Sequence, residues 1–115
     1  MIYLPLREGE SLARPMSASE SRSVTVANEQ GLHMRPAYLF AETAAKFQSE
    51  IEVAKDDLRI DGKSVLSILT LGAAKGAQLE LIATGPDAVE AINTLAELME
   101  TGFPESNGSE TPDKV

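Results

Sequence analysis

The stretch "SVTVANEQGLHMRPAYLFAETAAKF", residues 23–47, predicts a strand, a tight turn and a helix in succession. Its first six residues alternate apolar and polar side chains, as a half-buried strand does, with Val24 and Val26 on one face. Gly31 then permits a sharp turn, and Pro36 suits the first turn of a helix. The helix is indicated by apolar residues that recur every three or four positions, at Ala37, Phe40, Ala44 and Phe47.

Two short strands follow, residues 50–55 and 58–61, joined by a hairpin turn of two aspartates. A short apolar helix is expected next, because Ser64 is a good N-cap and Gly72 a good stop.

The last strand is "AQLELIA", residues 77–83, and the last helix lies within residues 85–103, with Pro86 in its first turn and Gly102 at its end. Its buried stripe is predicted at Val89, Ile92, Ala96 and Met99. The order βαββαβα predicts an α+β fold in which helices stack on one face of an antiparallel sheet.

Composition limits the classes of function. The chain has 115 residues, 43% of them hydrophobic, which suits one domain; we place it at residues 23–105, between a flexible extension (1–22) and a disordered tail (106–115). The net charge of −8 disfavours nucleic acid and anionic membranes as partners. With no cysteine and one histidine, neither a disulfide nor a zinc site is expected. No apolar run reaches the roughly 20 residues that span a bilayer, so we expect no membrane insertion.

The single histidine, His33, is expected at the N-terminus of the first helix. Backbone N–H groups and the helix dipole make such an end a favourable place for an anion. Arg35 adds a cation whose planar donors suit phosphate oxygens. The neutral form of imidazole offers a lone pair as nucleophile, and a phosphoryl group is the electrophile that these surroundings favour.

Two plainer interpretations stay open on the residues alone. A lone histidine near a helix start often caps or packs, and Arg35 could simply be solvated. Ser64 could likewise serve only as an N-cap. However, the apolar residues after it cannot all face one way, so part of this helix should be exposed, as protein contacts often are. A phosphate on Ser64 would place about two negative charges beside that surface and act as an off-switch.

The motifs together resemble the HPr family, the histidine-containing phosphocarriers of the bacterial phosphotransferase system. "GLHMRPA" (31–37) is followed by "GKSVLSILTLG" (62–72) and "AKGAQLELIATGPDAVEAINTL" (74–95), and the resemblance covers roughly residues 23–105. It implies the HPr-like open-faced β-sandwich, a four-stranded antiparallel sheet with three helices on one face. That architecture agrees with the order of elements read from the pattern.

The resemblance also implies roles. His33 matches the histidine that accepts a phosphoryl group from enzyme I and passes it to an enzyme IIA component, with phosphoenolpyruvate as the ultimate donor. Arg35 matches the arginine that stabilises the phosphate, and Ser64 matches the regulatory serine phosphorylated by HPr kinase/phosphorylase. The positions where the family docks its partners are Met34, Val65, Leu66 and Leu69.

We thus expect a cytoplasmic, monomeric carrier that functions in sugar transport. It should need no cofactor and no metal, and it is a substrate and donor in the phosphoryl relay rather than an enzyme. A transcriptional regulator is a further expected partner. The alternative is a regulatory module of the nitrogen-branch or catabolite-repression type, controlled by phosphorylation. A third interpretation, an adaptor in which neither residue is phosphorylated, is needed only if both sites are inert.

Overall fold

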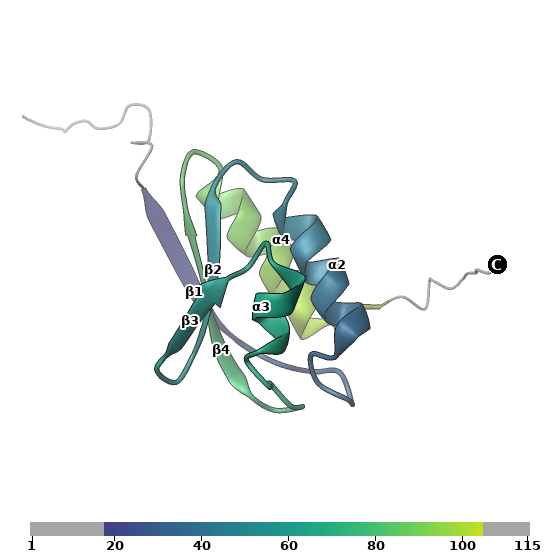
Figure 1. Cartoon of the computed structure of the whole chain (residues 1–115). Coiled ribbons are helices and arrows are strands. Elements are labelled where there is room, and N and C mark those ends of the chain that lie inside the picture. The colour runs from purple at the N-terminus through teal and green to yellow at the C-terminus, as the bar shows by residue number, and fades with distance from the viewer. Residues whose placement is uncertain (1–17, 105–115) are drawn as a thin grey trace, which may run out of the picture.

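The computed structural model describes residues 18–104, which form an open-faced sandwich (Figure 1). One layer is a four-stranded antiparallel sheet in the order β1-β4-β2-β3. The other layer consists of helices on one face of that sheet, as expected. The strands are β1 (Ser19–Thr25), β2 (Glu50–Lys55), β3 (Leu58–Asp61) and β4 (Gln78–Thr84), and the helices are α2 (Met34–Ala44), α3 (Val65–Leu69) and α4 (Ala88–Glu100).

The core lies between the two layers. Leu79, Leu81 and Ala83 point from β4 into it, as the alternation in the sequence predicts, and all three are buried. Helix α4 covers β1 and β4, while α2 packs against both α3 and α4. Phe40, on the buried stripe of α2, is the bulkiest fully buried side chain at 1% exposure. The sheet and the three helices therefore share one hydrophobic core.

The boundary expected after residue 22 is wrong, because β1 begins at Ser19. Residues 19–22 pair with β4, Ser19 opposite Thr84 and Arg22 opposite Leu81. This half of the strand carries polar side chains on both faces, so it lacks the alternation that indicates a strand. As an edge strand it is held mainly by backbone pairing, and Arg22 also donates to the side chain of Asn93 in α4, at 2.7 Å. Residues 1–17 of the expected extension and the expected tail, residues 106–115, lie outside the described part of the chain.

The predicted buried stripe of α4 is wrong at one position. Val89 is 43% exposed, whereas the buried face is formed by Ala88, Ala91, Ile92, Leu95, Ala96 and Met99. The prediction missed Leu95 and two small residues, Ala88 and Ala91, whose weakly apolar side chains give little signal in a sequence. Pro86 also precedes the N-cap residue, Asp87, so it lies before the helix and not in its first turn.

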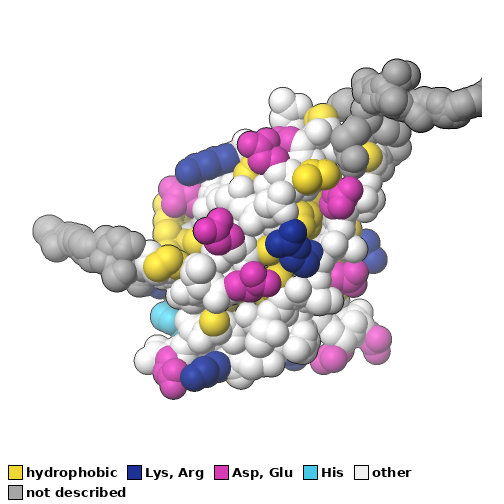
Figure 2. Space-filling model, turned by 180° about the vertical axis from the view of Figure 1, so that it is seen from behind, with side chains coloured by type: hydrophobic (Ala, Val, Ile, Leu, Met, Phe, Trp, Pro, Cys, Tyr) yellow, Lys and Arg dark blue, Asp and Glu magenta, His cyan; other side chains and the backbone are white. Residues whose placement is uncertain are grey.

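The turn and cap signals elsewhere are confirmed. The hairpin turns at Asp56, which adopts a positive φ of 54°. Ser64 caps α3, since its side chain accepts a hydrogen bond from the Ser67 N–H at 3.2 Å. Acidic side chains are spread over the face of the molecule shown in Figure 2, in line with the net charge.

Asp87 joins the start of α4 to the loop that follows α2. Its carboxylate accepts hydrogen bonds from the Ser49 hydroxyl at 2.6 Å and from the backbone N–H groups of Gln48 and Ser49 at 2.9 Å each. These contacts, the Ser49 hydroxyl first, lower the pKa of Asp87 below its ordinary 3.8, although partial burial acts the other way. The ionised carboxylate is therefore the form that stabilises the fold.

We expect Asp87→Ala to lower the free energy of unfolding by about 1–3 kcal/mol at pH 7, because it leaves the buried Ser49 hydroxyl without its acceptor. A group with a lowered folded-state pKa stabilises above its unfolded pKa and loses that effect as pH falls through the folded value. The difference in unfolding free energy between wild type and Asp87→Ala should thus have its full value above pH 3.8 and become smaller below it. Urea unfolding from pH 7 to pH 2.5 measures this, with Glu97→Ala, an exposed carboxylate on the same helix, as control. A difference in unfolding free energy that grows in acid would contradict a stabilising role for the ionised Asp87 carboxylate.

Candidate functional site

The loop between β1 and α2 is held in place by the loop before β4. The Leu32 N–H donates to the Ala73 carbonyl at 2.9 Å, and the Gly76 N–H donates to the Val26 carbonyl at 2.8 Å. Gly31 adopts a φ of 73°, and a Cβ there would collide with the Ala73 carbonyl oxygen. Only glycine combines this conformation with so close an approach. The residue that follows Leu32, His33, is therefore presented from a braced position.

His33 is the N-cap residue of α2, as the sequence predicts. Its backbone is extended, with φ −86° and ψ −168°, and its carbonyl accepts the first helical hydrogen bond, from the Ala37 N–H at 3.0 Å. Its side chain makes no capping hydrogen bond and is exposed. The imidazole therefore neither caps the helix by a hydrogen bond nor packs in the core, and it is accessible to a reactant.

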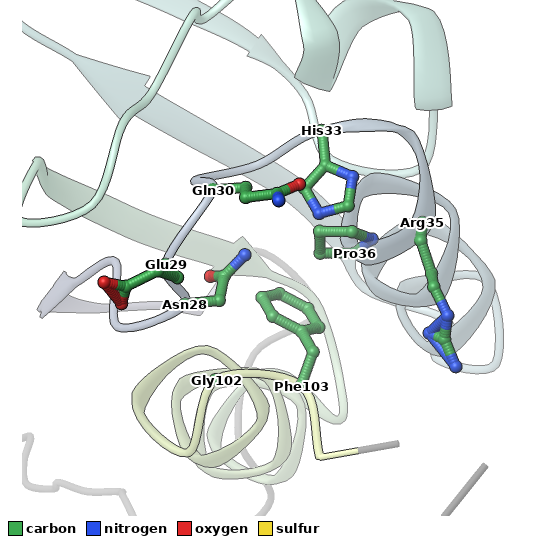
Figure 3. Close-up of a pocket in the computed structure, with 8 residues that line it drawn as sticks. All are labelled: Asn28, Glu29, Gln30, His33, Arg35, Pro36, Gly102 and Phe103. Atoms are coloured by element: carbon green, nitrogen blue, oxygen red, sulfur yellow. The ribbon is translucent and has the colours of Figure 1, made fainter. Parts of the chain in front are cut away.

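A pocket of about 270 Å³ lies beside this imidazole (Figure 3). Its apolar part is made by the buried residues Pro36 and Phe103. Phe103 reaches it because the chain turns after α4 through two residues with positive φ, Gly102 at 79° and Phe103 itself at 57°. The other lining residues are Asn28, Glu29, Gln30, His33 and Arg35.

Charge and polar groups are unevenly placed around the pocket. In Figure 3 the imidazole lies near Pro36 and the side chain of Gln30, whereas the Arg35 guanidinium is directed away from the ring. Both His33 and Arg35 line the pocket, and both side chains are exposed. The positive end of the α2 dipole acts from the same side. The surroundings favour an anionic group on His33.

Asn28 also lines the pocket and holds the turn before His33 in place. Its side-chain amide donates to the Gly31 carbonyl, and its Oδ1 is buried with no hydrogen-bond partner among the described residues. Sequence reasoning missed Asn28, Gln30 and Phe103. Asn28 and Gln30 stand in the quoted turn and could have been noticed by their distance from His33, but Phe103 lies 70 residues further along, so only the tertiary fold brings it there.

Ser64 does not line this pocket. It is half-buried at the start of α3, the helix that packs beside α2 (Figure 1). The neighbouring Lys63 donates its Nζ to the Phe47 carbonyl at 2.8 Å, which ties the start of α3 to the chain after α2. The two predicted phosphorylation sites therefore belong to adjacent helices but to separate surroundings.

The predicted docking residues divide into two kinds. Met34 and Leu66 are 58% and 73% exposed, while Val65 and Leu69 are half-buried and pack on the core. We call these four residues the α2–α3 patch. Tyr38, one turn after Met34 on α2 and 52% exposed, was missed by the sequence reasoning although its spacing could have indicated it.

Residues 18–104 contain neither a cluster of metal ligands nor a membrane-spanning helix. No group of three or more histidine, aspartate or glutamate side chains there is arranged to hold a metal ion. Within the same residues, no helix is both long enough and apolar enough to cross a membrane.

Comparison with known proteins places this site in a family. Residues 20–101 match the family PTS-HPr, described as the PTS HPr component phosphorylation site. Phosphocarrier protein HPr of Neisseria meningitidis serogroup A is 40% identical over 84 residues, which are 73% of this chain and 94% of that protein.

Solved structures of HPr and Crh superpose on this chain. HPr-C-His from Thermoanaerobacter tengcongensis superposes with a TM-score of 0.71 at 42% identity, covering 73% of this chain and 94% of that one. Crh, the Bacillus subtilis catabolite repression protein, which is a swapped dimer in its crystal, gives 0.60 at 34% identity, covering 69% and 91%. The fold, the braced histidine loop and these likenesses agree, and the chain belongs to the HPr family of phosphocarriers of the phosphotransferase system.

Proposed function

We propose that His33 is the phosphorylated residue, accepting a phosphoryl group from enzyme I and passing it to an enzyme IIA component, with phosphoenolpyruvate as the ultimate donor. The observation that carries this proposal is the exposed imidazole at the N-cap of α2, which makes no capping bond and opens onto the pocket that Arg35 lines.

The chemistry needs little from the protein beyond placement. An imidazole nitrogen attacks phosphorus, a nitrogen–phosphorus bond forms, and the bond from phosphorus to the donor breaks. Negative charge on the phosphoryl oxygens is stabilised by the N-terminal end of α2 and by Arg35. In the transfer to the acceptor, a nucleophile of that protein attacks phosphorus, a bond to the acceptor forms, and the nitrogen–phosphorus bond to His33 breaks. The protein is thus consumed and regenerated as a carrier, as members of this family are, and does not act as an enzyme.

The direct test is labelling. The full chain is incubated with phosphoenolpyruvate and the enzyme I of its own organism, and its mass is measured before and after acid treatment. One added phosphate that acid removes is expected, because phosphohistidine is acid-labile. No adduct, under conditions in which a known carrier is labelled, would refute the proposal.

Arg35→Ala is expected to slow phosphoryl acceptance by about tenfold to a hundredfold, since a charge-assisted hydrogen bond contributes about 1.5–3 kcal/mol. The side chain is exposed, so the free energy of unfolding should change by no more than about 0.5 kcal/mol. Rapid-quench kinetics with phosphorylated enzyme I measures the first effect and urea unfolding the second. Arg59→Ala, an exposed arginine on β3, is the matched control. A large fall in stability with an unchanged rate would reverse this assignment.

We further propose that Ser64 is a regulatory site for HPr kinase/phosphorylase, and that a transcriptional regulator reads its state. Its hydroxyl caps α3 directly beside Val65 and Leu66 of the α2–α3 patch. A phosphate there would be stable at the helix end yet would place about two charges against a surface that partners need apolar. With ATP and the kinase, an acid-stable phosphate should appear that Ser64→Ala lacks and Ser67→Ala keeps.

Partners are proposed to dock on the α2–α3 patch, in the cytoplasm, with the carrier as a monomer. Light scattering of the full chain tests the oligomeric state.

The similarity to Crh favours one second function, a regulatory module in which phosphorylation of Ser64 is the output and His33 is secondary. The two are separated by the labelling test, since only the carrier takes an acid-labile phosphate.

A further inference from the structure

We infer that Met34 is an oxidation site through which a peroxide lowers the protein's ability to dock its phosphoryl donor. The donor step belongs to the proposed function, and the inference about it rests on that proposal. What carries it is the position of one thioether. Met34 follows His33 directly and is the first residue of α2.

Solvent exposure makes Met34 more accessible to an oxidant than the other described methionine. The side chain of Met34 is 58% exposed, whereas Met99, the other methionine among residues 18–104, is 0% exposed in the core. Oxidation of a thioether requires that the oxidant reach the sulfur, so the two should differ widely in rate. The chain has no cysteine, and therefore no thiolate competes for a mild oxidant.

The step is a two-electron oxidation. A lone pair on the Met34 sulfur attacks one oxygen of hydrogen peroxide, the S–O bond forms and the O–O bond breaks. The departing hydroxide takes up the one proton that the sulfur-bound hydroxyl loses, and it leaves as water. Sulfur is oxidised by two electrons to the sulfoxide, and the peroxide is reduced to water.

The consequence follows from where the new oxygen lies. Met34 belongs to the α2–α3 patch, whose most exposed member is Leu66 at 73%, on the helix that packs against α2. A sulfoxide is polar, and covering it with an apolar partner surface removes water from its oxygen without a hydrogen bond in return. The fold should not suffer, because Met34 is more than half exposed and is not a member of the hydrophobic core cluster. The effect should therefore appear in docking and not in stability.

The first measurement is chemical. The full chain is treated with hydrogen peroxide, and peptide masses give the oxidation rate of each methionine. Met34 should be oxidised at least about tenfold faster than Met99. Equal rates at the two sites would overturn the inference, whatever the phosphotransfer assay shows.

The second measurement is kinetic. After treatment, the KM for phosphorylated enzyme I should rise by about tenfold with little change in kcat, because burying one methionine side chain contributes about that factor or more. Met34→Leu and Met99→Leu are treated in parallel, and each is compared with its own untreated rate. Met99→Leu should lose as much as wild type and Met34→Leu should lose little. Both proteins keep Met1 and Met16, so oxidation at those positions is controlled for.

Reversal completes the test. Incubation with both methionine sulfoxide reductases, one for each sulfoxide epimer, should restore the original KM. A KM that does not move on oxidation of Met34, or that moves equally in Met34→Leu, would overturn the effect on docking. Untreated protein that takes no phosphate would instead overturn the proposed function together with that effect, while the relative oxidation rates would still be measured.

Discussion

His33→Ala is expected to take no phosphate from phosphoenolpyruvate and enzyme I, while it folds as well as wild type. The imidazole is the only side chain of its kind in the chain, so no neighbouring residue can replace its nucleophilic nitrogen. Because the ring is exposed and makes no capping bond, its loss removes neither a core contact nor a side-chain cap of the helix. The free energy of unfolding should change by no more than about 0.5 kcal/mol.

Two controls make this result specific. His33→Gln keeps a polar side chain of similar size and should also fail, since an amide nitrogen has no available lone pair. Ser64→Ala should be labelled as wild type is, because Ser64 does not line the pocket. The mass of each protein after incubation, with and without acid, decides the matter. Full labelling of His33→Ala would show that another residue carries the phosphate.

Phe40→Ala is expected to have the largest effect on stability, a loss of about 3–5 kcal/mol in the free energy of unfolding. Phe40 is 1% exposed on the inner side of α2, and its ring fills space that the sheet and the other helices share. Truncation leaves a cavity that the surrounding side chains cannot fully close. For a domain of this size that loss is a large part of a total near 5–15 kcal/mol.

Tyr38→Ala is the matched control. It removes an aromatic ring from the same helix, but that ring is 52% exposed and its hydroxyl makes only a 3.4 Å contact with Glu42. Its cost should remain within about 1 kcal/mol. Urea unfolding followed by circular dichroism gives both values from the denaturation midpoints. If the two variants lose equal stability, Phe40 does not have the core role described here.

Much of the fold followed from periodicity. The strands β2 and β4 and the helices α2 and α4 were indicated by apolar side chains that recur with the period of the element. Strand β3 was indicated by the hairpin turn before it, and helix α3 by its cap and stop residues. The misses share one cause. The polar half of β1 and the missed core residues Ala88 and Ala91 of α4 are placed by neighbours distant in sequence, β4 for the strand and the sheet for the helix. Local hydrophobicity carries no record of such contacts.

The site divides in the same way. By itself the sequence determined which groups are present: one imidazole before a helix, an arginine two residues later, and a serine able to cap the next apolar helix. Only the tertiary structure decided that the imidazole is free, because the Ala73 carbonyl fixes the loop and Phe103 closes the pocket from 70 residues away. Helix starts and turns arise from interactions within a few residues, which a sequence shows directly. Accessibility depends on every segment that packs nearby, and that is a property of the folded chain.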